Sequence, residues 1–132
     1  MRRSLVLLAL LLAVACGLAG CGGGGGSNLY TAQSAKTCLR GLNVKIAPAT
    51  DFVATTATGG AFRAVFPDNS VTMVFGLTQA DADNIADAYR RFRAKNVGID
   101  DVLREDNNAV MLWHLHPADA SSALVGGCLK ST

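Results

Sequence analysis

Two stretches near the middle of the chain place an apolar side chain at every second position, namely residues 61–66 and residues 71–75. A period of two is typical of β-strands, because successive side chains of a strand point to opposite faces. Between the two stretches, residues 67–70 are a proline followed by three small polar residues, which favour a tight turn. The pattern therefore predicts an antiparallel hairpin with one apolar face.

The stretch from Thr78 to about Lys95 has a helical period instead. Its apolar positions recur at intervals of three or four residues, at Ala82, Ile85, Tyr89 and Phe92. Thr78 is a good N-cap, and Asp81 at the third helical position can return a hydrogen bond, as in a capping box. Acidic residues come early and basic residues late, which suits the helix dipole. These signals predict an amphipathic helix directly after the hairpin.

A second copy of this turn, strand and helix start follows later in the chain. Residues 67–82 and residues 105–120 align without a gap, and 7 of the 16 positions are identical. The identical pairs are Asp68 with Asp106, Asn69 with Asn107, Met73 with Met111, Leu77 with Leu115, and 80–82 with 118–120. The alignment predicts strands near 99–104 and 109–115 and a helix over about 117–129. A chance match between two segments rich in Ala and Asp is the alternative.

Before the first hairpin, residues 30–41 have apolar positions at helical spacing and end at a glycine, so they predict a leading helix. An extended piece is expected at 44–46, and residues 51–54 fit either a turn of helix or a strand. Together these elements predict a single α+β domain over residues 28–132. It consists of a leading helix and two hairpin-plus-helix (ββα) units, which form a four-stranded antiparallel sheet with helices on one face.

The segment 1–20 has the composition of a secretion signal. Arg2 and Arg3 give a positive start, residues 4–15 carry no charge, and small residues lead into Cys21. A positive start, an apolar middle and a small-residue end are the parts of a signal peptide. The apolar run is shorter than the roughly 20 residues that a membrane-spanning helix needs.

The tetrapeptide Leu18-Ala19-Gly20-Cys21 resembles the lipobox of bacterial lipoproteins, in which an aliphatic residue and two small residues precede a cysteine. The resemblance implies that residues 1–20 are removed and that a diacylglyceryl group is attached to the thiol of Cys21. It covers the segment 1–21, and we recognise no family for the rest of the chain. The alternatives are an ordinary secretory signal with an incidental cysteine, or an anchor helix that is not cleaved.

Residues 22–27, five glycines and a serine, follow the lipidated cysteine. Such a segment is a flexible linker with an end-to-end distance of about 14 Å. The sequence thus predicts three parts: a signal peptide (1–20), a lipidated cysteine with its linker (21–27) and the globular domain. We expect the domain to lie at the extracytoplasmic side of a cell membrane or outer membrane.

Processing also changes the charge of the chain. Loss of Arg2 and Arg3 lowers the number of Lys and Arg residues from 12 to 10, which equals the 10 Asp and Glu residues. A nucleic-acid-binding domain usually carries a clustered basic excess. We therefore expect no nucleic-acid partner. We expect the protein to associate with the membrane through its lipid anchor.

Two cysteines, Cys38 and Cys128, remain in the domain. An exported protein folds in an oxidising compartment, where an even pair of cysteines favours a disulfide. The sequence therefore predicts a Cys38–Cys128 bond between the start and the end of the domain. A reactive thiol pair or a pair of metal ligands is the alternative, although the two cysteines lack the short CxxC spacing.

His114 and His116 are two apart in a predicted strand, so their side chains would lie on one face. Such a pair is a credible half of a zinc or copper site, which needs at least one further ligand. The internal alignment offers another interpretation. It pairs His116 with the N-cap Thr78, and Pro117 then stands at the first helical position, which proline favours.

Patterns typical of catalysis are weak. No G-x-S-x-G elbow, phosphate-binding glycine loop or calcium-loop pattern occurs in the sequence. The carboxylate pairs at 100–101 and 105–106 fit solvated turns, since adjacent residues of a strand face opposite ways. The sequence therefore predicts a protein that is not an enzyme and needs no cofactor.

The second face of the predicted sheet is fairly apolar for a surface in contact with water. It carries Thr72, Val74, Val110, Leu112 and His114. If no other element covers this face, it is a partner or ligand surface. The leading hypothesis is a membrane-tethered, non-catalytic module that binds an envelope protein or a small ligand. A metal-binding lipoprotein is the second hypothesis, and a small envelope enzyme is the third.

Overall fold

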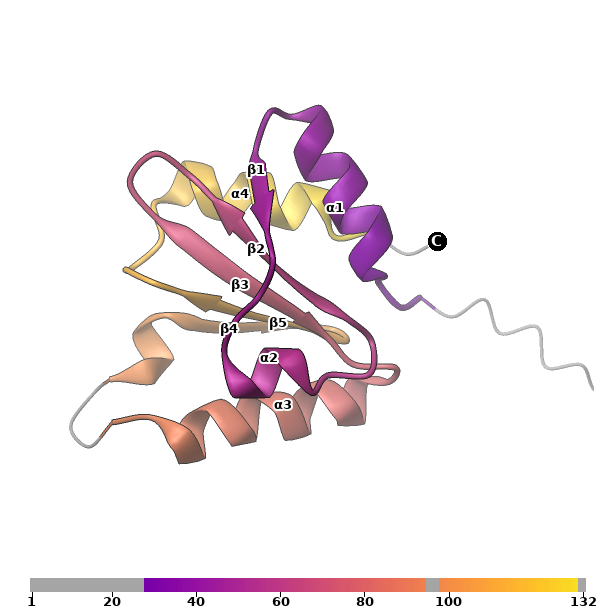
Figure 1. The fold of residues 1–132 in the computed structure, drawn as a ribbon, viewed down its shortest axis with the longest axis vertical. Coiled ribbons are helices and arrows are strands. Elements are labelled where there is room, and N and C mark those ends of the chain that lie inside the picture. The colour runs from indigo at the N-terminus through magenta and orange to yellow at the C-terminus, as the bar shows by residue number, and fades with distance from the viewer. Residues whose placement is uncertain (1–27, 95–97, 131–132) are drawn as a thin grey trace, which may run out of the picture.

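The computed structural model describes residues 28–94 and 98–130. The predicted signal peptide, the lipidated Cys21 and the glycine linker lie outside the described residues. The elements follow in the order α1 (Ala32–Gly41), β1 (Lys45–Ala47), α2 (Phe52–Thr55), β2 (Ala61–Val65), β3 (Ser70–Phe75), α3 (Gln79–Phe92), the 3₁₀ turn η1 (Ile99–Asp101), β4 (Leu103–Asp106), β5 (Ala109–Trp113) and α4 (Asp119–Cys128) (Figure 1). The mixed α+β class predicted from the sequence is confirmed.

The sheet has five strands in the order β1-β2-β3-β5-β4, and every neighbouring pair is antiparallel. The prediction of four strands is therefore wrong by one. The extra strand is β1, whose Ile46 pairs with Ala64 of β2. It has three residues and Pro48 follows it directly, so the sequence signal was too short to place it in the sheet.

Helices cover both faces of the sheet, which corrects the prediction that they lie on one face. Figure 1 shows α1 and α4 on one side of the strands and α2 and α3 on the other. The reason is visible in β3, where Met73 packs into the core beneath α1 and α4 and Val74 packs into the core beneath α2 and α3. Both side chains are fully buried. A strand that is apolar on both faces needs a covering layer on each.

The two segments of the internal alignment supply β3 and β5, which pair with each other in the sheet. The central pair of the alignment, Met73 and Met111, are Cα partners in the pairing of β3 with β5. Met73 belongs to the hairpin β2–β3 and Met111 to the hairpin β4–β5. An approximate twofold axis that passes between these two residues therefore relates one hairpin to the other. The helices do not follow the same symmetry, because α3 joins one core and α4 joins the other. The prediction of two equivalent ββα units is thus wrong for the helices.

The capping box predicted at the start of α3 is confirmed. The Asp81 backbone N–H donates to Thr78 Oγ1 (3.1 Å), and the Thr78 backbone N–H donates to Asp81 Oδ2 (3.0 Å). Gly76, two residues before the cap, has a packing role. A Cβ on Gly76 would lie 2.6 Å from the carbonyl oxygen of Thr78, so only glycine lets the chain turn this closely into the helix.

The predicted disulfide is present between Cys38 of α1 and Cys128 at the end of α4. Its two Cα atoms are 5.5 Å apart, and 90 residues of sequence separate the cysteines. The bond joins the first and last helices of the fold, which pack together over the larger core. It closes nearly the whole domain into one loop, which restricts the unfolded chain.

Asn108 is the one buried polar side chain among the residues that the structure describes, and it is 1% exposed. Its Oδ1 accepts from the backbone N–H of Tyr30 (2.7 Å), and its Nδ2 donates to the carbonyl oxygens of Tyr30 (2.9 Å) and Gly76 (2.8 Å). This amide therefore connects three separated segments: the entry to α1, the end of β3 and the turn before β5.

Replacing both Cys38 and Cys128 by serine is expected to lower the free energy of unfolding by about 2–5 kcal/mol. The physical reason is the greater freedom of the unfolded chain once the loop is open. Urea denaturation followed by circular dichroism measures the change. The oxidised parent chain and the parent chain kept in reductant are the references. An unchanged midpoint in the double variant contradicts the structural role of this bond.

Asn108→Ala is expected to destabilise the domain by roughly 2–4 kcal/mol, because it removes the partner of the buried Gly76 carbonyl and of the half-buried N–H and carbonyl of Tyr30. Thermal denaturation measures this loss. Asn84→Ala, on the exposed surface of α3, is the matched control and should leave the midpoint nearly unchanged. Equal midpoints for the two variants would show that Asn108 does not hold these segments.

Candidate functional site

The two histidines do not form the strand pair predicted from the sequence. Strand β5 ends at Trp113, so both His114 and His116 lie beyond it on exposed chain. The His116 Nδ1 atom is 2.7 Å from Asp101 Oδ1. The alternative role of His116 as a helix cap is also wrong, since Ala118 is the N-cap of α4. Within 28–94 and 98–130, no group of three or more His, Cys, Asp or Glu side chains could hold a metal ion.

The predicted apolar sheet surface is largely covered. Val74 and Val110 are fully buried beneath α2 and α3, and this is a correction of the expected partner surface. Thr72 and Leu112 are half-buried, and His114 is exposed. The covering layer is incomplete, because α2 has only four residues. Leu112 therefore stays at the edge of the covered part of the sheet, where it lines a cavity.

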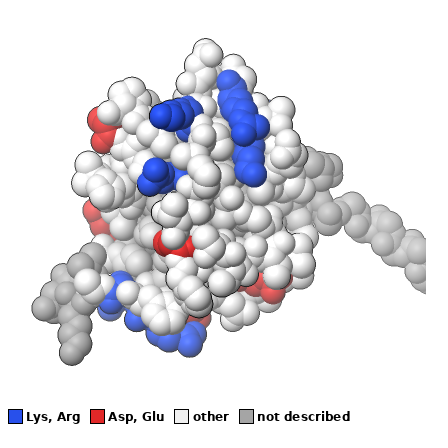
Figure 2. Space-filling model, viewed as in Figure 1, with Lys and Arg blue, Asp and Glu red and all other residues white. Residues whose placement is uncertain are grey.

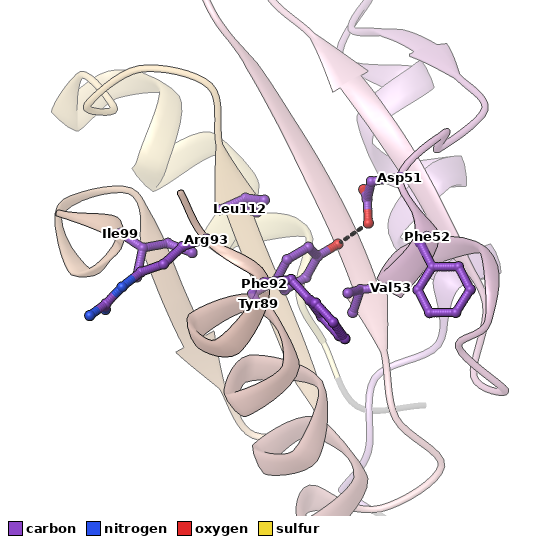
Figure 3. Close-up of a pocket in the computed structure, with 8 residues that line it drawn as sticks. All are labelled: Asp51, Phe52, Val53, Tyr89, Phe92, Arg93, Ile99 and Leu112. Atoms are coloured by element: carbon purple, nitrogen blue, oxygen red, sulfur yellow. Dashed lines mark hydrogen bonds between the residues drawn. The ribbon is translucent and has the colours of Figure 1, made fainter. Parts of the chain in front are cut away.

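This cavity lies between α2, α3, η1 and β5, and its volume is about 490 Å³ (Figure 3). Small-molecule sites usually measure about 300–1,000 Å³ and have mostly apolar walls with few polar groups. The residues that line it are Asp51, Phe52, Val53, Tyr89, Phe92, Arg93, Ile99 and Leu112. In size and in the character of its walls, the cavity fits a small apolar ligand.

Two phenylalanines stand at the cavity with most of their surface in water. Phe52 opens α2 and is 72% exposed, and Phe92 closes α3 and is 71% exposed. Their ring centroids are 6.4 Å apart and the rings are nearly perpendicular, at 82°. A pair of neighbouring aromatic rings left unburied in this way is typical of a binding surface. The two rings belong to different helices, so the fold brings together side chains that are far apart in the sequence.

Beside the rings, Tyr89 and Asp51 form a hydrogen bond between α3 and α2. The Tyr89 hydroxyl donates to Asp51 Oδ1 (2.9 Å), and the same oxygen accepts from the Ala54 backbone N–H (2.8 Å) as the N-cap of α2. Burial raises the pKa of Tyr89 far above its ordinary value, and the hydrogen bond and negative charge of Asp51 raise it further. The phenol therefore stays protonated and remains a donor.

Arg90 fixes the end of α3 against η1 and β4. Its guanidinium pairs with Asp87 (3.3 Å), with Asp100 (3.4 Å) and with Glu105.

Arg93, the other arginine at this end of α3 near the cavity, is oriented differently. Its stem lines the cavity, whereas its guanidinium points away from the Tyr89–Asp51 pair (Figure 3). Figure 2 shows Lys and Arg side chains gathered at this end of α3.

Sequence reasoning missed most of this site. It assigned Tyr89 and Phe92 to a core stripe, and it left 51–54 open between helix and strand. The structure gives α2 there, capped by Asp51. The available signal was local: an aspartate three residues before Ala54 is a typical N-cap arrangement. No local pattern could show that Phe52 meets Phe92.

No described helix is long and apolar enough to cross a membrane. Comparison of the chain with protein-family models, with the curated proteins and with the solved structures gives no match. A function for this protein is therefore inferred from its fold and its cavity.

Proposed function

We propose that this protein is a lipid-anchored, extracytoplasmic binding module whose cavity between α2 and α3 takes up a small apolar molecule. The observation that carries the proposal is the pair of exposed rings, Phe52 and Phe92, in contact at a cavity of ligand size. Burying such rings against a ligand removes a large apolar area from water, which favours binding.

The anchor is proposed from the lipobox-like segment that ends at Cys21. The Cys38–Cys128 disulfide is consistent with an exported protein, since such bonds persist in oxidising compartments. With the short linker 22–27, the cavity would stay close to the membrane surface. A small molecule that partitions near lipid would then meet the site at a raised local concentration.

Lipidation gives the first prediction from this proposal. Mass spectrometry of the N-terminal peptide is expected to show that it begins at Cys21 and carries the mass of a diacylglyceryl group. Cys21→Ser should abolish this mass. Cys16→Ser is the matched control, because it changes a neighbouring cysteine that lacks the preceding aliphatic residue, and it should leave the lipid in place. An unmodified parent peptide, or loss of lipid in the Cys16 variant, contradicts the anchor.

The binding site gives the second prediction. A neutral aromatic probe, 1-naphthalenemethanol, should bind the full chain in lipid nanodiscs, with empty nanodiscs subtracted. Replacing Phe52 and Phe92 together by alanine should raise the dissociation constant about tenfold or more, because about 1.4 kcal/mol of ring contact corresponds to tenfold. Ligand-observed NMR measures the affinity.

The control for this experiment is Leu77→Ala. Leu77 is 60% exposed and precedes α3 at the end opposite Phe92, so it removes exposed apolar surface away from the cavity. We expect the parent affinity in this variant. Parent-like affinity in the double phenylalanine variant would overturn the proposed function.

A further inference from the structure

We propose that the ligand of this cavity is a free organic cation, namely an amine with an aromatic or similarly bulky apolar body, whose ammonium group lies beside the Asp51 carboxylate. The inference rests on the proposed function, because it names the class of molecule that the same cavity takes. It is argued from the charge, the hydrogen bonds and the aromatic rings of the cavity.

The Asp51 carboxylate receives two hydrogen bonds in the structure. Among the residues that the structure describes, Asp51 takes part in no salt bridge. Its hydrogen bonds from Tyr89 and Ala54 both end on Oδ1. Neither donor is charged, so neither neutralises the carboxylate, which lines a cavity with mostly apolar walls. A ligand with a positive charge would complement it.

Arg93 is the other charged residue that lines the cavity. Figure 3 shows its guanidinium directed away from the Tyr89–Asp51 pair, so its aliphatic stem is what forms the wall. Arg93 is exposed, so water weakens the field of its guanidinium, whereas Asp51 is half-buried. Of these two charges, the Asp51 carboxylate therefore acts more strongly on a ligand in the cavity.

The aromatic rings favour the same class of ligand. Phe52, Tyr89 and Phe92 all line the cavity, and the face of an aromatic ring attracts a cation through its quadrupole. An apolar body would fill the remaining space against Val53, Ile99 and Leu112. A lipid choline headgroup fits less well, because its phosphate would lie close to the carboxylate of Asp51. A free amine with its own apolar body meets both requirements.

The test uses three probes that share a naphthalene body and differ in charge: 1-naphthylmethylammonium, 1-naphthalenemethanol and 1-naphthoate. Each is titrated against the full chain in phosphatidylglycerol nanodiscs, which contain no amine headgroup, with empty nanodiscs subtracted. The parent chain and Asp51→Asn are compared in the same discs. Asparagine is also a good N-cap and can still accept from Tyr89 and Ala54, so the variant removes the charge and keeps the hydrogen bonds.

We expect the parent chain to bind the ammonium probe most tightly and the carboxylate probe most weakly. Asp51→Asn should weaken ammonium binding about tenfold, which is the size of effect typical of one partly desolvated charge contact. It should leave the affinity for the neutral probe within about twofold of the parent. Asp83→Asn, at an exposed position of α3, is the matched charge control and should change neither affinity.

The outcomes separate this inference from the proposed function. Equal binding of the neutral and ammonium probes, or an ammonium affinity that Asp51→Asn does not change, overturns the organic-cation inference while the cavity remains a binding site. Absence of binding by all three probes overturns the proposed function itself. Weaker ammonium binding in Asp51→Asn with unchanged neutral binding supports both.

Discussion

The fold depends on the burial of β3 and β5 on both faces. Their side chains alternate between two cores, and a sheet centre of this kind is stable only when a layer covers each side. On one side α1 and α4 form this layer, and the Cys38–Cys128 bond joins them. On the other side α3 carries most of the cover, and α2 contributes a single short turn of helix. The two layers are therefore unequal.

The cavity follows from this inequality. The layer that α2 and α3 form leaves Leu112 half-buried and the rings of Phe52 and Phe92 exposed. Next to the four-residue helix there is a space of about 490 Å³ beside the sheet. The hydrogen bond between Tyr89 and Asp51 joins α3 to the start of α2 beside this space. It also places a carboxylate in an apolar setting.

Local signals predicted much of the fold. The hairpin at 61–75 and the Thr78 cap are correct in type and nearly in position, because turn residues, alternation and capping act within a few residues. The disulfide could be predicted because the domain contains two cysteines, Cys38 and Cys128. The alignment of Met73 with Met111 located the centre of the sheet, although the sequence could not say which face each following helix would cover. That choice is made by tertiary packing, because both faces of β3 are apolar.

The candidate site was not predictable in the same way. Phe52, Tyr89 and Leu112 come from three separated elements, and their meeting depends on α3 covering the second face of the sheet. The sequence reasoning placed His114 and the strand side chains on an open surface because it expected all helices on the other side. Because α3 buries Val74, the part of this sheet face that stays uncovered lies at Leu112, beside the cavity.

The central claim is that ligand binds in the α2–α3 cavity and on no other surface of the domain. Amide NMR spectra of the isotope-labelled full chain in nanodiscs, recorded while 1-naphthylmethylammonium is added, test it most directly. The account predicts that the largest shift changes fall on residues 51–53 and 89–93, with little change at Leu39 of α1 and Val125 of α4. Largest changes on the α1–α4 side, or changes spread evenly over the domain, would contradict it.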